Sequence, residues 1–203
     1  MKRRDDFLVG PRERAARAIR AGKTEEALRA LQDACEEFHG LHDNYCNHLS
    51  LTQALLAEIK GDEWFASFTR DHVFEGYRPR FAKWREMTPE QRVEAICAMH
   101  RAHFSEFHVE EDEEKFVVKI TACNAGGRLL RDGIARRQQG LVGKPHPWSF
   151  DSADFPYYCV HAHFFNELWD DMGLKVHIEW GRQYDEQGNK RDEPCRYTVL
   201  KKG

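Results

Sequence analysis

The stretch FHVEEDEEKFVVKI, residues 107–120, decides the fold class, because it has the composition of two short strands joined by a turn. Val, Ile and Phe occupy both halves of the stretch, and such residues are enriched in strands. The acidic run at residues 111–114 separates the two halves as a polar turn. We therefore expect a hairpin near the middle of a chain that is otherwise rich in helix signals.

Upstream of this hairpin the sequence predicts helices. Residues 11–21 are rich in Ala and Arg and begin at Pro11, a favourable residue for a first helical turn. A second helix is expected to start near Thr24, to carry apolar residues at helical spacing, and to be interrupted at Gly61. An aromatic-rich helix follows, and Pro79 is expected to bend or break it.

A further helix is expected to begin at Thr88, which is followed by a Pro and, three residues on, by a Gln. The helix should end near residue 104. Residues 123–154 are punctuated by Gly, and long segments of this kind are usually functional or disordered. Residues 155–172 predict an amphipathic helix, and residues 174–181 and 195–200 predict a closing pair of strands.

These elements predict an α+β fold, in which an N-terminal helical layer packs on a small antiparallel sheet with a long C-terminal helix and a terminal hairpin. Residues 1–104 would form the helical region and residues 105–203 the α+β region, and the two would make one compact unit. Hydrophobic residues are 41% of the 203, which is enough to build a core.

The composition excludes several classes of partner. Lys and Arg number 31 against 34 Asp and Glu, so the net charge of −3 argues against a general role in coating DNA or RNA, and we expect no nucleic acid partner, with a local basic patch left open. No apolar run approaches the ~18 residues that a membrane span requires. The first residues lead into no apolar signal core, so we expect a cytoplasmic, reduced protein.

Six Cys and eleven His stand out in this composition. In a reducing compartment, cysteines are more often core residues, metal ligands or nucleophiles than disulfides. Cys35 and Cys97 lie among apolar residues at helical spacing, so we assign them to the core. Cys46 stays unassigned.

The other thiols predict a metal site. Cys159, His163 and Glu167 are spaced i, i+4, i+8 on the predicted C-terminal helix, and a thiolate with an imidazole one turn away suits zinc. Cys123 ends a predicted strand and Cys195 begins one. The alternative is a partly buried helix with incidental histidines. The expected metal is zinc, or else iron, and the expected ligands are Cys123, Cys159, His163 and Cys195.

A second His-rich stretch, residues 38–48, supplies acid–base candidates. His42 and Cys46 are spaced i, i+4, and Asp43 is placed to orient a histidine or a substrate. A helix junction with solvated histidines would give the same pattern. The expected catalytic residues are His42, Asp43, Tyr45 and His161.

Substrate contacts are expected around the glycine-rich segment. Arg128 follows the turn Gly126-Gly127 and is a fixed cation able to hold a carboxylate or phosphate. His146 and Trp148 flank a Pro, where the Trp either covers a pocket or plugs the core. The expected substrate-binding residues are Arg128, His146, Trp148 and Tyr158.

The C-terminal half, residues 106–201, resembles the 4-vinyl-reductase-type (V4R-like) ligand-binding domains. The features that carry the resemblance are Cys159, the strand Val176–Glu179 and Cys195. In phenol-sensing members of that superfamily, Cys and Glu at such positions bind a structural zinc beside a pocket for an aromatic ligand. The resemblance therefore implies zinc and an aromatic or other small ligand.

The chain departs from that pattern after Glu179. The usual Cys shortly after the Glu is missing, and Gly181 and Arg182 stand in that region. Another group would have to complete the zinc site, and Cys123 or His163 is expected.

Residues 40–200 are also similar to a poorly characterised bacterial family with the motifs His-Asp-x-Tyr, Cys-x-x-Gly-Gly-Arg, His-Pro-Trp-Ser-Trp and Tyr-Tyr-Cys-x-His-Cys. Here these motifs match residues 42–45, 123–128, 146–150 and 157–162. The chain differs at Phe150 and Ala162, which removes a ligand at position 162. The motifs imply a shared site more firmly than a particular reaction.

Two functions follow as expectations. The first is a metal-dependent hydrolase or lyase acting on a small organic acid or an aromatic substrate. The second is a non-catalytic small-molecule sensor with a structural zinc, and it is less favoured because the sequence contains no recognisable DNA-binding or output segment. An interaction protein is least favoured, since the charge pattern shows no heptad seam. A small molecule is the expected partner, and a homodimer is left open.

Overall fold

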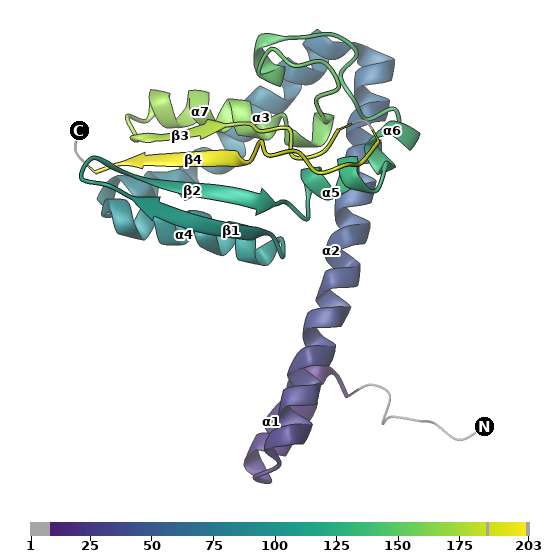
Figure 1. Ribbon diagram of the computed structural model, residues 1–203, viewed down its shortest axis with the longest axis vertical. Helices are drawn as coiled ribbons and strands as arrows, with labels where there is room; N and C mark the ends of the chain where they lie inside the picture. The colour runs from purple at the N-terminus through teal and green to yellow at the C-terminus, as the bar shows by residue number, and fades with distance from the viewer. Residues whose placement is uncertain (1–8, 186, 202–203) are drawn as a thin grey trace. The chain divides into compact units, whose positions relative to one another are not determined.

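The computed structural model describes residues 9–185 and 187–201 and has the predicted α+β fold (Figure 1). The chain divides into two compact units between Tyr45 and Cys46, inside α2, whereas the predicted boundary after residue 104 falls within the second unit. None of the described helices combines the length and apolarity needed to cross a bilayer. The elements in chain order are α1 (Pro11–Arg20), α2 (Thr24–Lys60), α3 (Asp62–Ala82), the 3-10 turn η2 (Lys83–Glu86), α4 (Pro89–Ala102), β1 (Glu106–Glu111), β2 (Lys115–Ala122), α5 (Gly126–Arg131), α6 (Ile134–Arg137), the 3-10 turns η3 (Pro147–Ser149) and η4 (Tyr157–Cys159), α7 (His161–Asp171), β3 (Val176–Glu179) and β4 (Cys195–Leu200).

The helix boundaries follow the local signals in the sequence, with one exception. Gly61 has φ 85°, a left-handed conformation that favours Gly, and it separates α2 from α3. The capping box at Thr88 is formed, because its Oγ1 accepts from Gln91 N and its N–H donates to Gln91 Oε1. Of the bend or break expected at Pro79, the break does not occur: α3 continues past Pro79 to Ala82.

The first unit is a helical hairpin of α1 and the first turns of α2. Arg14 Nη1 lies 2.7 Å from Asp33 Oδ2, so α1 runs back along α2. The assignment of Cys35 to the core is wrong, because its side chain is exposed, whereas Cys97 on α4 is buried as predicted. The buried residues of the hairpin are all small: Ala15, Ala18, Ala27 and Ala30.

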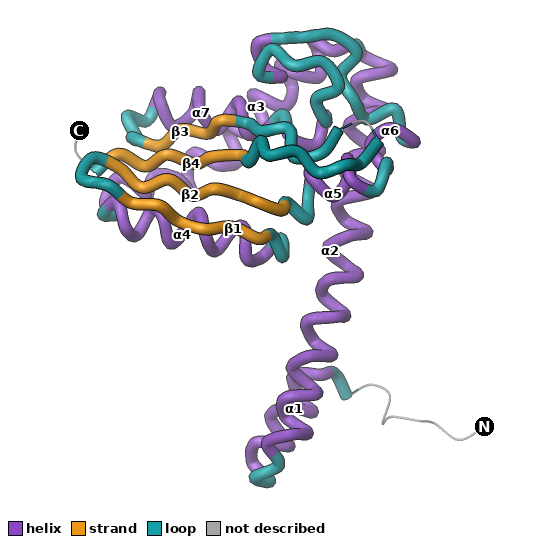
Figure 2. The backbone as a smooth tube through the Cα atoms, in the orientation of Figure 1, coloured by secondary structure: helices purple, strands orange, loops and turns teal. Residues whose placement is uncertain are grey.

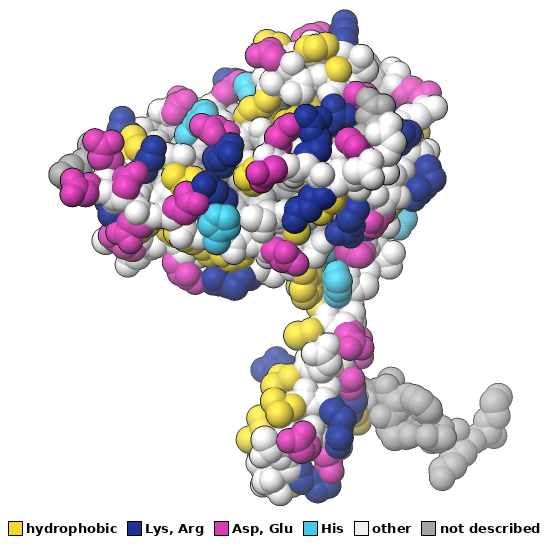
Figure 3. Space-filling view, in the orientation of Figure 1, with side chains coloured by type: hydrophobic (Ala, Val, Ile, Leu, Met, Phe, Trp, Pro, Cys, Tyr) yellow, Lys and Arg dark blue, Asp and Glu magenta, His cyan; other side chains and the backbone are white. Residues whose placement is uncertain are grey.

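The second unit is built on a four-stranded antiparallel sheet in the order β1-β2-β4-β3 (Figure 2). Both predicted pairs of strands are confirmed, and Ile120 on β2 lies opposite Cys195 on β4. Along β2 buried residues alternate with half-buried ones, so α4 and α7 cover one face only. Charged side chains gather over the other face of the sheet (Figure 3).

An aromatic cluster joins the helices above the covered face. Trp169 of α7 is fully buried, and its ring centroid lies 5.3 Å from that of Phe81 and 5.8 Å from that of Trp84. Phe165 packs edge-to-face on Phe81 from the preceding turn of α7. Burying rings of this size contributes several kcal/mol in total and fixes α7 against α3.

The C-terminal helix is shorter than predicted. Residues 155–160 are not α-helical: Pro156 forms a β-bridge with Leu141, and η4 follows before α7 begins at His161. The glycine-rich segment upstream is folded into α5, α6 and η3 and is not an open loop.

Asn166 on α7 closes the outer edge of the sheet. Its Nδ2 donates to Ile178 O at 2.8 Å, and Ile178 N donates to its Oδ1 at 2.7 Å. Because the Asn166 side chain is buried, these two bonds satisfy backbone groups of β3 that water does not reach easily.

Replacing Asn166 by Ala should therefore lower the free energy of unfolding by about 2–3 kcal/mol, because the two backbone groups of Ile178 lose their partners. Urea unfolding followed by circular dichroism measures the change. Asn44→Ala, at an exposed position of α2, should change stability by less than about 0.5 kcal/mol. Equal effects of the two substitutions would contradict the role given to Asn166.

Candidate metal site

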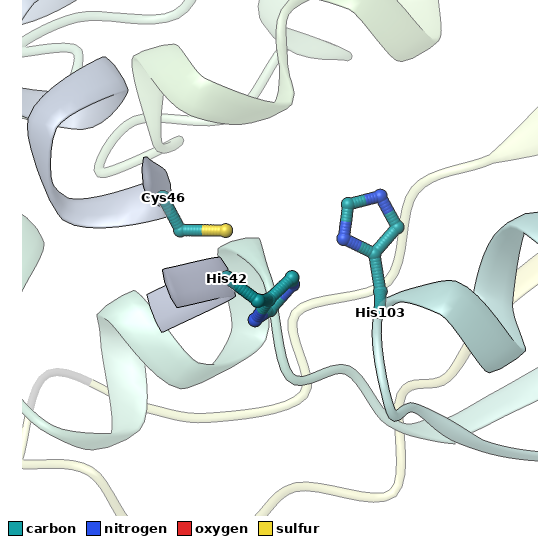
Figure 4. A group of neighbouring side chains, drawn as sticks. All are labelled: His42, Cys46 and His103. Carbon is teal, nitrogen blue, oxygen red and sulfur yellow. The ribbon is translucent and has the colours of Figure 1, made fainter. Parts of the chain in front are cut away.

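His42, Cys46 and His103 form a group that could hold a metal ion (Figure 4). One ligand atom from each residue lies within 4.8 Å of the other two. His42 and Cys46 are buried, and His103 is half-buried. Figure 4 shows the Cys46 and His42 side chains leaving α2 next to each other, with the His103 ring opposite them.

Two local relations place these three residues. His42 and Cys46 lie one turn apart on the uninterrupted helix α2, so the helix itself puts their side chains on one face. His103 is the C-cap residue of α4 and belongs with Cys46 to the second unit. The sequence predicted the His42–Cys46 spacing but assigned the pair no metal.

Polar neighbours hold two of the three ligands. His42 Nδ1 lies 3.0 Å from Asp43 Oδ1, the contact by which a carboxylate commonly orients a metal-ligating histidine. Cys46 Sγ lies 3.3 Å from Tyr158 Oη. Burial raises the pKa of Tyr158, and the neighbouring Cys46 thiol raises it further, so the phenol keeps its proton and is the donor towards a Cys46 thiolate.

Arg128 lies beside this group but is not presented as an open substrate anchor. Its Nη2 donates to Asn47 Oδ1 at 2.8 Å and its Nε to Asn124 O at 3.3 Å, and the guanidinium is buried. Asp132 lies 3.8 Å from Nη1. The residue therefore fixes a positive charge next to Cys46 while bonding to groups of the protein.

The three predicted thiol ligands lie around the glycine turn: Cys123 follows β2, Cys195 begins β4 and Cys159 ends η4. A Cβ on Gly126 would come within 2.3 Å of Cys159 Sγ, and a Cβ on Gly127 within 2.9 Å of Cys123 Cβ. Cys195 Sγ accepts from Gly181 N at 3.3 Å. The glycines are therefore required for close approach, and the groups that approach them are cysteine side chains of the chain itself.

Burial keeps two of these thiols protonated when no metal is bound. It raises the pKa of Cys159 well above its usual value, and the nearby Cys123 and Cys195 add to the shift. It also raises the pKa of Cys195 to about 12. A neutral, packed thiol is a poor nucleophile, so these residues are not activated as they stand.

The predicted set of Cys123, Cys159, His163 and Cys195 is not brought together as a group of the kind that His42, Cys46 and His103 form in the described part of the chain. His163 faces another way: its Nε2 lies 3.1 Å from Glu167 Oε1, and its ring packs edge-to-face on Phe150. The predicted one-face spacing fails at Cys159 because that residue lies in η4 and not in α7.

The remaining predicted site residues fall into two places. His161 is next to the group, since its ring centroid lies 5.9 Å from that of Tyr158. Burial lowers the pKa of His161 to about 4, so its imidazole is neutral. His146 and Trp148 lie elsewhere, stacked at 4.6 Å, and His146 Nε2 contacts Asp62 Oδ2 at 3.2 Å. Trp148 is buried, which favours the plug over the pocket cover. Tyr45 is exposed on α2.

Sequence reasoning missed His103. It follows the predicted end of α4, where a His usually serves as a helix-terminal cation. The only local signal was its spacing of three residues from His100, and His100 is not a member of the metal group. Its partners on α2 lie far away in the sequence, so no spacing rule connects them.

Comparison with known proteins found no match for this chain. No protein family, no curated protein and no solved structure matches the chain. The resemblances found in the sequence therefore stay predictions.

Gly126→Ala should lower the free energy of unfolding by about 1–3 kcal/mol, because the new methyl group collides with Cys159 Sγ. Cys159→Ala in the same chain should recover at least about 1 kcal/mol of that loss, as measured by a double-mutant cycle in urea. Gly143→Ala is the control, since nothing lies within 4 Å of its added Cβ. Additive losses in the double variant would contradict the contact.

Lowering the pH should also reduce the stability of the folded chain through His100, which precedes His103 by one turn. Burial lowers the pKa of His100 to about 3, from an ordinary 6.5. The unfolded chain therefore binds a proton below pH 6.5 that the folded chain refuses until near pH 3, and stability declines between those values.

In metal-free protein, His100→Leu should reduce the loss of unfolding free energy below pH 6.5 by about 1 kcal/mol for each pH unit. Denaturant unfolding between pH 7 and pH 5 measures this slope. Asn44→Ala, at an exposed position that carries no titratable group, should leave the slope unchanged. A slope that His100→Leu does not alter would mean that His100 titrates as freely in the folded chain as in the unfolded one.

Proposed function

We propose that the protein is a zinc-dependent enzyme, a hydrolase or lyase that acts on a small organic acid or an aromatic compound. The observation that carries the proposal is the group of His42, Cys46 and His103, whose ligand atoms lie within 4.8 Å of one another. Two imidazoles and one thiolate are a donor set that zinc accepts readily, and iron accepts similar ligands.

The number of ligands favours catalysis over a purely structural role. Structural zinc is commonly closed by four protein ligands, whereas catalytic zinc keeps one position for water or substrate. Three ligands from the protein leave such a position. A metal there would supply a Lewis acid or an activated water.

The surrounding residues support an acidic substrate. Asp43 Oδ1 lies 3.0 Å from His42 Nδ1 and Tyr158 Oη lies 3.3 Å from Cys46 Sγ, so both ligands have a polar partner that orients them. The buried guanidinium of Arg128 bonds to Asn47, the residue after Cys46. This buried guanidinium is the feature on which the acidic substrate is proposed, through its charge and not through a direct contact.

A sensor with a structural metal is the second candidate, favoured by one observation. Cys46 is among the groups that raise the pKa of Cys159, so additional thiols lie near the metal group. If one of them moved into the fourth position, the metal would be closed and the site would bind ligand without reacting with it. The resemblance to V4R-like domains favours the same outcome.

Metal content tests the site itself. Protein purified without chelator should carry close to one zinc per chain, and His103→Ala should lose most of it, since two protein ligands hold zinc far more weakly than three. Elemental analysis by mass spectrometry measures both values. His108→Ala is the matched control, because it removes an exposed histidine of β1 that is not part of the metal group. A metal content that His103→Ala and Cys46→Ser both leave intact would place the metal elsewhere.

Cobalt(II) in place of zinc separates the two candidate functions. An open fourth position predicts that azide or acetate shifts the visible cobalt bands, while a closed site of four protein ligands predicts no shift. Cys159→Ser should change the spectrum only in the closed case. A spectrum that azide and acetate do not shift, but that Cys159→Ser changes, would contradict the enzyme proposal and favour the sensor.

A further inference from the structure

The hairpin of the first unit exposes an apolar row along α2, interrupted only by the buried His42 between Phe38 and Tyr45. We name this row the hairpin seam, and its members are Leu28, Leu31, Cys35, Phe38 and Tyr45. Leu28 is 54% exposed, Leu31 51% and Tyr45 61%, and Cys35 is exposed as well. Hydrophobic side chains gather along this hairpin in Figure 3.

The spacing of the seam is the spacing of paired helices. Positions 28, 31, 35 and 38 alternate by three and four residues, which is the a/d pattern of a coiled coil, and Tyr45 lies two turns beyond Phe38 on the same side of α2. The charge pattern of the chain shows no heptad seam, so the apolar residues alone carry this spacing. The exposure of these side chains distinguishes the seam from an ordinary core-facing stripe.

The hairpin has little core of its own. Within it the buried hydrophobic residues are alanines, and the large apolar side chains are on the outside. A pair of helices that buries only methyl groups gains little from packing, so the large side chains would contribute far more if they were covered.

The charges of the hairpin identify what fits against it. Residues 11–29 hold six Lys or Arg and three Glu, whereas residues 30–45 hold four Asp or Glu and no Lys or Arg. Arg14 on α1 lies beside Asp33, so the positive end, at the turn between α1 and α2, is formed by Arg17, Arg20, Lys23 and Arg29, and the acidic end lies towards Asp43. Two identical hairpins side by side in opposite directions would place each basic end against an acidic end, while the same direction would place like charges together.

We propose that the hairpin seam binds a second copy of this chain, with the two α2 helices antiparallel. The interface is isologous, as a two-fold dimer requires, and the four helices of two hairpins form a bundle. Cys35 lies near the middle of the seam, so the two Cys35 thiols lie close to the two-fold axis. Leu28 of one chain lies opposite Tyr45 of the partner chain.

Sedimentation of the full chain tests the assembly. The expected particle has twice the 23.8 kDa chain mass at concentrations of about 10–100 µM, where interfaces of modest size associate. Leu31→Glu should convert it to a monomer, and because Leu31 is exposed, helix content by circular dichroism should not change. A wild-type monomer throughout this range would overturn the proposal, including the case in which another part of the same chain covers the seam.

Gly40→Glu is the matched control. Gly40 lies nine residues from Leu31, on the opposite side of α2, and nothing lies within 4 Å of an added Cβ. The same charge there should leave the dimer intact. A dimer that neither substitution disturbs would place the interface elsewhere and overturn the proposal.

Cross-linking tests the direction. In a Cys35→Ser background, a mixture of Leu28→Cys and Tyr45→Cys chains treated with diamide should form a disulfide between unlike chains, while Leu28→Cys alone should not cross-link through residue 28, because about 26 Å of helix separates residues 28 and 45. Efficient 28–28 linkage would show parallel helices and overturn the proposal. Metal content in Leu31→Glu should stay at the wild-type value, which separates failure of the dimer from failure of the metal site.

Discussion

The burial of Trp169 between Phe81 and Trp84 is the interaction on which the second unit depends. It fixes α7 against α3, and α7 in turn covers the sheet beside β3. Without this contact Tyr158, which precedes α7 by three residues, would have no fixed position beside Cys46. The polar site is therefore positioned by an apolar contact that takes no part in its chemistry.

The chemistry of the site is set by which protons stay in place. Tyr158, Cys159 and Cys195 are all buried enough to remain protonated, while His161 is buried enough to remain neutral. Metal binding should consequently release protons, and affinity should rise with pH.

Local features of the fold could be predicted from the sequence, and features that depend on distant contacts could not. The capping box at Thr88 and the strand pair around residues 107–120 are encoded within a few residues, so both predictions are confirmed. Cys35 was misplaced because periodicity shows that a helix has an apolar side but not whether anything covers it. The metal group required His103, which only the packing of α4 brings near α2. Cys123, Cys159 and Cys195 lie near one another, yet spacing could not show that Cys159 lies in η4, outside the helix that carries His163.

The side chain of Asn166 has a consequence for the edges of the sheet. An open edge strand is a template on which another chain can add a strand, and this is a common route to aggregation. The amide of Asn166 occupies the free backbone groups of Ile178 and so acts as a one-residue substitute for the missing neighbour strand. The other open edge of the sheet is β1. There the exposed residues Glu106, His108 and Glu110 make the approach of a second chain unfavourable. One edge is protected by a hydrogen-bonding plug and the other by charge.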